Sequence, residues 1–147
     1  MEDREIVILL VEDNLSHAKL VQRGLAACNR AHRVVHVSDG AAALAFLARR
    51  EPFAAEVDNP LPDVVMLDLR LPKIDGLEVL RQIRSEPALA EIAVVVLSTS
   101  SAESDRAQAH DLKADRYVVK PLDYKQFSQL INGLGLFRLA CNDPSCP

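Results

Sequence analysis

Short, uninterrupted apolar runs alternate along the chain with longer segments whose apolar residues recur every three or four positions. Such runs are typical of strands buried on both faces of a sheet, and three-and-four spacing is typical of amphipathic helices. The runs predict strands at residues 6–11, 32–37, 63–69, 92–100 and 115–119. The amphipathic segments predict helices at residues 15–30, 41–50, 74–86, 102–114 and 123–139.

Individual residues support these limits. The run Ser38-Asp39-Gly40 is a cap-like turn before the second helix, and Pro87 ends the third. Residues 51–62 hold three of the eight prolines and show no period, which predicts a loop. The apolar stripe of the first helix is Leu15, Ala18, Val21, Leu25 and Cys28. The inward residues of the third helix are predicted to be Leu77, Val79, Leu80 and Ile83.

Five strands that alternate with five helices predict an α/β domain in which a parallel sheet is covered by helices on both faces. A chain of 147 residues fits one such domain, which we place at residues 1–140, followed by a loose tail at 141–147. Ligands of doubly wound parallel sheets bind at the carboxyl ends of the strands. The residues that follow each predicted strand are therefore the candidates for chemistry.

Composition narrows the function classes. The net charge is −4 and no basic block is present, which argues against nucleic-acid binding. The apolar runs fall far short of the roughly 20 residues of a membrane helix. Acidic residues near the N-terminus argue against a signal peptide, so a cytoplasmic location is expected. The odd count of three cysteines suits reduced thiols, and Cys141 and Cys146 are expected to be exposed in the tail.

Polar residues stand at or just after the ends of four of the predicted strands. They are Glu12, Asp13, Asp68, Ser98 and Lys120, and Pro121 follows Lys120. Three carboxylates held close together repel one another, so a positive partner is required. Oxygen ligands without His or Cys favour a hard cation, Mg²⁺ or Mn²⁺. A carboxylate nucleophile, a metal, a hydroxyl and an ammonium group together indicate phosphoryl transfer.

Four motifs at these positions resemble the receiver domain of bacterial two-component response regulators. They are VEDN at 11–14, LDLRLPKIDG at 67–76, LSTS at 97–100 and YVVKP at 117–121. The resemblance covers roughly residues 5–139. It implies a flavodoxin-like sheet of strand order 2-1-3-4-5. It also implies a stand-alone response regulator that accepts a phosphoryl group from a sensor histidine kinase and catalyses only its own phosphorylation and dephosphorylation. Such a regulator would signal to a downstream protein either through a phosphorylation-dependent surface or by onward phosphotransfer.

The same resemblance assigns roles at the metal site and the phosphoacceptor. Asp68 would be the phosphoacceptor and a Mg²⁺ ligand. Asp13 would bind the metal directly and Glu12 through water. The backbone carbonyl of Arg70 would complete the protein ligands.

Further roles concern the switch. Ser98 and Lys120 would contact the phosphoryl oxygens. Tyr117 would turn inward when Ser98 moves, although a strand aromatic that only packs is the alternative. Pro121 would follow a cis peptide bond, and such a turn would aim Lys120 at the site.

Two features depart from the commonest receiver pattern. The switch hydroxyl is Ser98 rather than Thr, and the link containing residues 51–62 is long. This loop and the C-terminal LGLFRL resemble the receivers that partner bacterial and cyanobacterial phytochromes. That resemblance implies a homodimer through the fifth strand and the last helix. The apolar candidates for this contact are Leu134, Leu136, Phe137 and Leu139, which could instead cover the sheet.

Two other functions remain open on the sequence alone. A phosphatase of the haloacid dehalogenase type would place a second Asp two residues after the first, where this chain has Arg70. A protein-binding module with a receiver fold could act without phosphorylation, but such modules usually lose an acid or the Lys. His17 is expected on the surface of the first helix, and no role is assigned to His32, His36 or His110.

Overall fold

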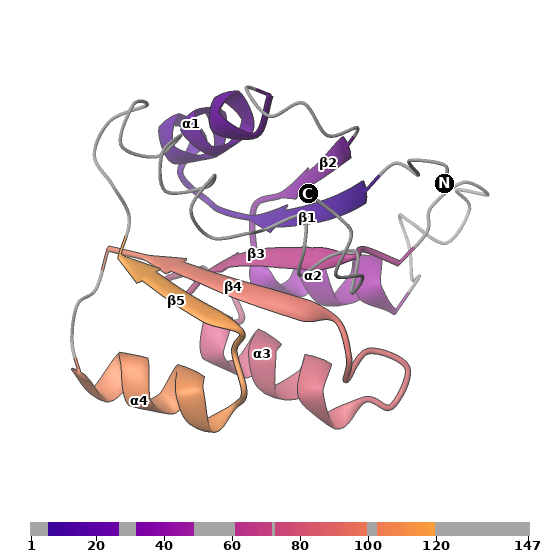
Figure 1. The fold of residues 1–147 in the computed structure, drawn as a ribbon, viewed down its shortest axis with the longest axis vertical. Helices are drawn as coiled ribbons and strands as arrows, with labels where there is room; N and C mark the ends of the chain where they lie inside the picture. The colour runs from indigo at the N-terminus through magenta and orange to yellow at the C-terminus, as the bar shows by residue number, and fades with distance from the viewer. Residues whose placement is uncertain (1–5, 27–31, 49–60, 72, 100–102, 120–147) are drawn as a thin grey trace, which may run out of the picture.

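A five-stranded parallel sheet with strand order β2-β1-β3-β4-β5 forms the centre of the protein, as a computed structural model shows (Figure 1). The structure describes residues 6–26, 32–48, 61–71, 73–99 and 103–119. The strands are β1 (Ile6–Val11), β2 (His32–Val37), β3 (Val64–Asp68), β4 (Ala93–Ser98) and β5 (Arg116–Val119). The helices are α1 (Leu15–Ala26), α2 (Gly40–Leu47), α3 (Gly76–Ser85) and α4 (Glu103–Asp111).

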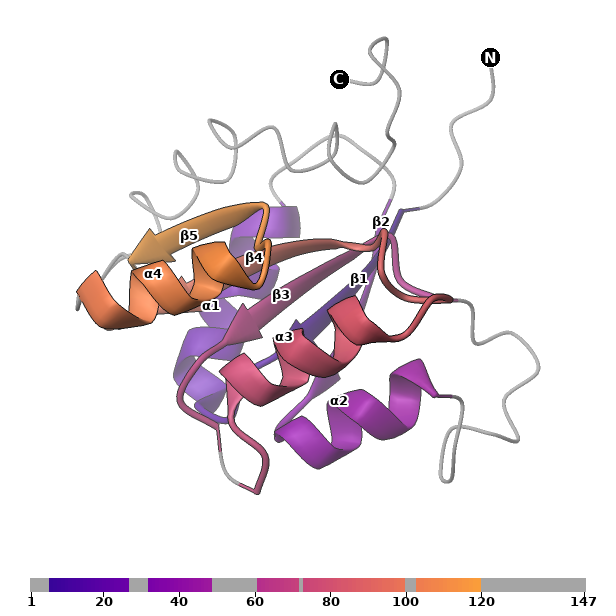
Figure 2. The same cartoon turned by 90° about the horizontal axis from the view of Figure 1, so that it is seen from below.

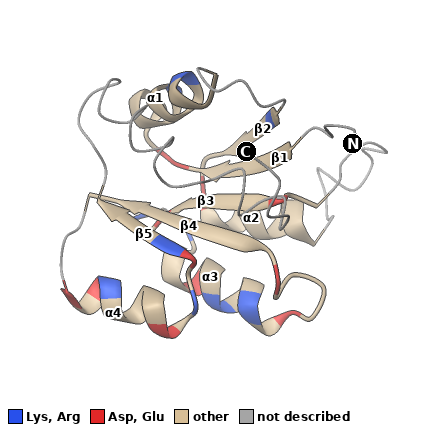
Figure 3. Ribbon diagram, viewed as in Figure 1, with Lys and Arg blue, Asp and Glu red and all other residues tan. Residues whose placement is uncertain are grey.

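The helices cover the two faces of the sheet unequally within the described residues. Helix α1 lies on one face, whereas α2, α3 and α4 lie side by side on the other (Figures 1 and 2). Charged residues gather on the helices and loops, and the strands carry few of them (Figure 3). Burial of apolar surface on both faces is therefore the main stabilising contribution, at roughly 25 cal/mol per Å².

Alternation along β1 shows how one strand serves both cores. Ile6, Ile8 and Leu10 belong to the cluster that packs against α1. Leu9 and Val11 belong to the cluster that packs against α2, α3 and α4. All five are at most 1% exposed, which explains why the strand is a continuous apolar run rather than an alternating one.

The starts of β3 and β5 are anchored by aspartates in the same way. The carboxylate of Asp63 accepts a 2.8 Å hydrogen bond from the backbone N–H of Val7, and the Asp63 N–H donates to the Val7 carbonyl. The carboxylate of Asp115 likewise accepts from Val94 at 2.7 Å, and its N–H donates to the Val94 carbonyl. Each aspartate thus fixes the register of its strand against the neighbouring strand.

Arg84, at the end of α3, secures the second of these anchors. It is 15% exposed, and its guanidinium donates to the carbonyls of Ala90, Ile92 and Lys113 and to the Asp115 carboxylate. One side chain therefore ties α3 to the segments that lead into β4 and β5. The planar fork of Arg suits several acceptors at once.

The fold class and strand order predicted from the sequence are confirmed. The strands and helices begin or end within a few residues of their predicted limits. Leu15 departs from the predicted stripe of the first helix, because it is 65% exposed at the helix start. The helix predicted at 123–139, Cys28, the tail and residues 51–60 lie outside the described residues.

None of the helices in the described ranges is long and apolar enough to span a membrane.

Candidate functional site

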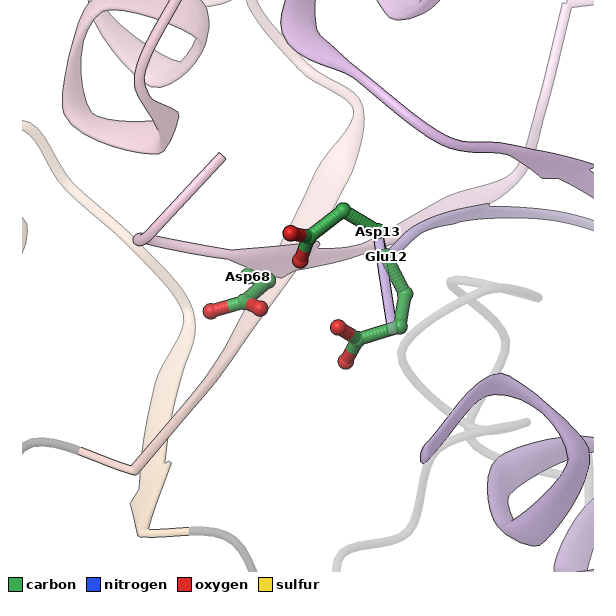
Figure 4. A group of neighbouring side chains, drawn as sticks. All are labelled: Glu12, Asp13 and Asp68. Atoms are coloured by element: carbon green, nitrogen blue, oxygen red, sulfur yellow. The ribbon is translucent and has the colours of Figure 1, made fainter. Parts of the chain in front are cut away.

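Three carboxylates meet where β1 and β3 end. The two strands are neighbours, with Val11 paired to Leu67, so the residues that follow them emerge side by side. Figure 4 shows the side chains of Glu12, Asp13 and Asp68 turned toward a common space. One carboxylate oxygen from each lies within 4.8 Å of the others. The predicted convergence of these acids is therefore confirmed.

Two of the three acids are buried. Glu12 is 2% exposed and Asp68 is 7% exposed, whereas Asp13 is exposed. Backbone N–H groups hold the buried pair in place: Asn14 donates to Glu12 Oε2 at 3.1 Å, and Arg70 donates to Asp68 Oδ1 at 3.1 Å. These bonds orient the two carboxylates at the ends of their strands.

This donor set fits a hard divalent cation. Carboxylates of like charge held this close repel one another, and a bound cation offsets that repulsion. Oxygen-only ligands match Mg²⁺ and Mn²⁺, and Mg²⁺ is commonly held by one or two carboxylates together with water and phosphate oxygens. The exposure of Asp13 leaves one side of the site open to such ligands.

His36, a residue to which the sequence assigns no role, contacts the backbone of Glu12. Its Nε2 lies 2.8 Å from the backbone carbonyl oxygen of Glu12. The N–H of Glu12 in turn donates to the Val37 carbonyl on the same strand, at 3.1 Å. Strand β2 therefore braces the turn that carries Glu12. His17 lies on α1, half-exposed, with its Nδ1 4.0 Å from Glu12 Oε1.

Ser98 lies at the end of β4, on the strand next to Asp68. Asp68 pairs with Leu97, so Ser98 follows one position beyond the phosphoacceptor candidate. Ser98 is fully buried, at 0% exposure, whereas most serines in proteins are exposed. Its position agrees with the predicted hydroxyl contact, although that role stays a prediction.

Tyr117 lies on β5, beside the middle of β4, and is half-buried. The guanidinium carbon of Arg106 on α4 lies 5.1 Å from the centre of its ring. A cation at this distance over a ring face is attracted by the ring electrons, by about 0.5–1 kcal/mol at an exposed site. The aromatic predicted to take part in switching is thus in contact with α4.

Gly76, the first residue of α3, packs closely against the backbone of Asp68 and Leu69. Its N–H donates to the carbonyl of Leu69 at 3.0 Å. A Cβ at residue 76 would lie 2.2 Å from the carbonyl oxygen of Asp68 and 2.6 Å from the Cα of Leu69. Only glycine allows this approach, so the first turn of α3 holds the backbone of the phosphoacceptor candidate at the end of β3.

Asp39 and Lys73 tie α2 to the loop that follows β3. Asp39 caps α2 by accepting from the Ala42 N–H at 2.7 Å, and Lys73 Nζ lies 3.4 Å from its carboxylate. The pKa of Asp39 lies below its ordinary value of 3.8 because the Ala42 N–H, and to a lesser degree Lys73, favour the charged form over a smaller opposing effect of desolvation. Lys73 itself adopts a φ of 68°.

Arg70 has a partner that the sequence did not indicate. Its guanidinium makes a 2.7 Å ion pair with Asp105, a buried residue of α4. Nothing in the sequence spacing pairs these two residues. The backbone carbonyl of Arg70 as a metal ligand stays a prediction, and Lys120 and Pro121 lie outside the described residues.

Comparisons with known proteins agree with this geometry. Residues 8–132 match the family described as the response regulator receiver domain. The chain is 38% identical over 133 residues to response regulator Rcp1 of Synechocystis sp., a match that covers 90% of this chain and 88% of that protein.

Two solved structures extend the comparison. The phosphorylated cyanobacterial phytochrome response regulator RcpA superposes with a TM-score of 0.85 at 40% identity, over 97% of this chain and 100% of that one. The Mn²⁺-bound form of Rcp1 superposes with a TM-score of 0.83 at 37% identity, over 97% and 99% of the two chains.

Proposed function

The chain belongs to the response regulator receiver domain family, and on that premise we propose that it is a signalling switch whose phosphoacceptor is Asp68. One observation carries the assignment. Asp68 is a buried carboxylate at the end of a central strand, with oxygens of two further carboxylates within 4.8 Å. No observation on the described residues favours the phosphorylation-independent binding module.

The reaction is an in-line displacement on phosphohistidine. A carboxylate oxygen of Asp68 forms the new O–P bond while the P–N bond breaks, and the released electron pair stays on the imidazole, which takes up a proton. The N–H of Arg70 holds Asp68 in place for the attack. Asp13 and Asp68, and Glu12 through water, would hold Mg²⁺, which would supply the positive charge that lets an anionic nucleophile approach phosphorus.

The acyl phosphate then acts on neighbouring strands. Ser98 donates a hydrogen bond to a phosphoryl oxygen, and Lys120 neutralises part of its charge. Movement of Ser98 at the end of β4 opens room for Tyr117 on β5, whose ring is in contact with Arg106 of α4. The output is a changed surface on α4 and β5, set by the difference in contacts between the two states.

The proposed phosphodonor is a sensor histidine kinase of the phytochrome class. Support comes from RcpA, a cyanobacterial phytochrome response regulator, which this chain matches over 97% of its length at 40% identity. We further propose that the protein works in the cytoplasm, as a homodimer that uses β5 and the predicted helix at 123–139. Val119 on the edge strand β5 is 38% exposed and is a candidate for that contact.

Phosphotransfer from a purified phytochrome-class kinase, autophosphorylated with radiolabelled ATP, tests the assignment. Label is expected to move from the kinase to the wild-type protein in the presence of Mg²⁺. It is not expected to move to Asp68→Asn, which keeps the shape of the side chain but removes its nucleophile. Asp111→Asn, an exposed carboxylate on α4, is the matched control and is expected to behave as wild type. Equal labelling of Asp68→Asn would refute the assignment.

A further inference from the structure

Arg70 contacts both the proposed phosphoacceptor, Asp68, and helix α4, which connects β4 to β5. Its backbone N–H donates to Asp68 Oδ1 at 3.1 Å. Its guanidinium Nη2 lies 2.7 Å from Asp105 Oδ2 on α4. The Arg70 side chain is 67% exposed and the Asp105 side chain is 12% exposed, so an accessible cation here meets a largely buried carboxylate.

This ion pair is one of the contacts that attach α4 to the rest of the protein. The helix is mostly polar, and within it only Asp105 and Ala109 are buried. A helix usually docks through a broad apolar stripe, which α4 lacks. The next residue, Arg106, stacks on Tyr117. Asp105 and Arg106 are adjacent in α4. The first is thus linked to Arg70, just after β3, and the second is linked to β5.

We propose that the Arg70 guanidinium is shared between Asp105 and a phosphoryl group on Asp68, and that this exchange couples phosphorylation to the position of α4. The inference rests on the proposed function, since it requires a phosphoryl group at Asp68. Arg70 is thus a positioning residue: its side chain holds α4 through Asp105. This role is separate from that of its backbone N–H, which donates to Asp68.

Charge and geometry both favour the exchange. A phosphoryl group adds three strong acceptor oxygens and more negative charge than the carboxylate it replaces. Arg binds phosphate in a bidentate manner, and such charge-assisted bonds are roughly twice as strong as neutral ones. Arg70 is only two residues from Asp68 and its side chain is exposed, so its guanidinium can turn between the two anions.

Withdrawal of the guanidinium changes the environment of Asp105 more than that of Arg70. The Asp105 carboxylate, at 12% side-chain exposure, then loses a 2.7 Å charge-assisted bond to the segment that follows β3. This loss weakens the attachment of α4 and favours its movement toward solvent. The exposed Glu103, in the same first turn, has no such constraint. Loss of a partly exposed ion pair is expected to raise local opening of α4 by about fivefold.

Amide hydrogen exchange of peptides covering residues 103–111 measures this opening. The wild type is compared with Asp105→Asn, which keeps the shape and removes the charge, and with Arg70→Gln. Glu103→Gln is the matched control because it removes the same charge from the same helix turn and so has the same effect on the helix dipole. Each sample is measured before and after acetyl phosphate with Mg²⁺, and intact mass gives the phosphorylated fraction.

In the wild type, exchange is expected to rise about fivefold on phosphorylation. In Asp105→Asn and Arg70→Gln it should already be raised by a similar factor, with little further change, and the double variant should equal either single one. Added salt should speed exchange in the wild type and in Glu103→Gln but not in Asp105→Asn. A stability loss alone would produce neither the salt dependence nor the non-additivity.

The outcomes separate this inference from the proposed function. Full phosphorylation of the wild type with unchanged exchange at 103–111 would overturn the exchange of partners and leave Asp68 as phosphoacceptor. Additive effects of Asp105→Asn and Arg70→Gln would also overturn it. No gain of phosphoryl mass in the wild type would refute the proposed function, and the inference would fall with it.

Discussion

Substitution of Gly76 by alanine tests whether the first turn of α3 holds Asp68 in place. The added Cβ would lie 2.2 Å from the Asp68 carbonyl oxygen and 2.6 Å from the Leu69 Cα. Both neighbours are backbone atoms, which cannot rotate away as a side chain would. The end of β3 or the start of α3 must therefore shift.

Two opposing effects set the magnitude. Alanine in a helix is favoured over glycine by up to about 1 kcal/mol. Forcing a methyl group into a closely packed site typically costs about 1–3 kcal/mol. The contact distance at Gly76 places it toward the upper part of that range. A net destabilisation of about 1–2 kcal/mol follows, equivalent to a fall in Tm of roughly 2–8 °C for a chain of this size.

Urea unfolding followed by far-ultraviolet circular dichroism is the suitable assay, because the chain has no Trp and only two Tyr. Ser85→Ala, near the other end of α3 and exposed, is the control for helix propensity without crowding. Gly76→Ala should also slow phosphorylation by acetyl phosphate, since the Asp68 backbone is displaced. A Gly76→Ala protein as stable as wild type and phosphorylated at the same rate would refute the reasoning.

Three further predictions concern other contacts. Arg84→Lys should destabilise by about 2 kcal/mol in urea unfolding, because an ammonium group cannot reproduce the fork that reaches three carbonyls and Asp115, whereas the exposed Arg81→Lys should change stability little. Asp39→Asn should be less stable than wild type by a few tenths of a kcal/mol near neutral pH. Because the folded pKa is depressed, this difference should be fully present above 3.8 and vanish as pH falls through the folded pKa, which urea unfolding across about pH 3–6 would check. Asp13→Asn should weaken Mn²⁺ binding in calorimetry by at least about tenfold, and equal affinity would exclude that residue as a ligand.

Much of the fold followed from the sequence because the central strands are buried on both faces. Continuous apolar runs such as Ile6–Val11 have few alternatives to a covered parallel sheet, and the structure confirms that strand at its predicted limits. The convergence of Glu12, Asp13 and Asp68 also followed, because parallel strands bring their carboxyl ends to one edge.

The contacts that the sequence did not indicate join residues far apart in the chain without periodic signals. Arg70 and Asp105 are 35 positions apart, and α4 is too polar for its buried face to be identified from hydrophobic spacing. Leu15 was predicted on an apolar stripe but is exposed, since the stripe begins one turn later, at Ala18. Such details depend on tertiary packing, which local patterns do not encode.

Intact mass after incubation with acetyl phosphate is the most direct test of the central claim that Asp68 is the phosphoacceptor of a metal-dependent switch. The wild type should gain the mass of one phosphoryl group with Mg²⁺ and none in excess EDTA. Asp68→Asn should gain none in either condition, while Asp111→Asn should gain as much as wild type. A gain that persists in Asp68→Asn, or that needs no divalent cation, would contradict the account.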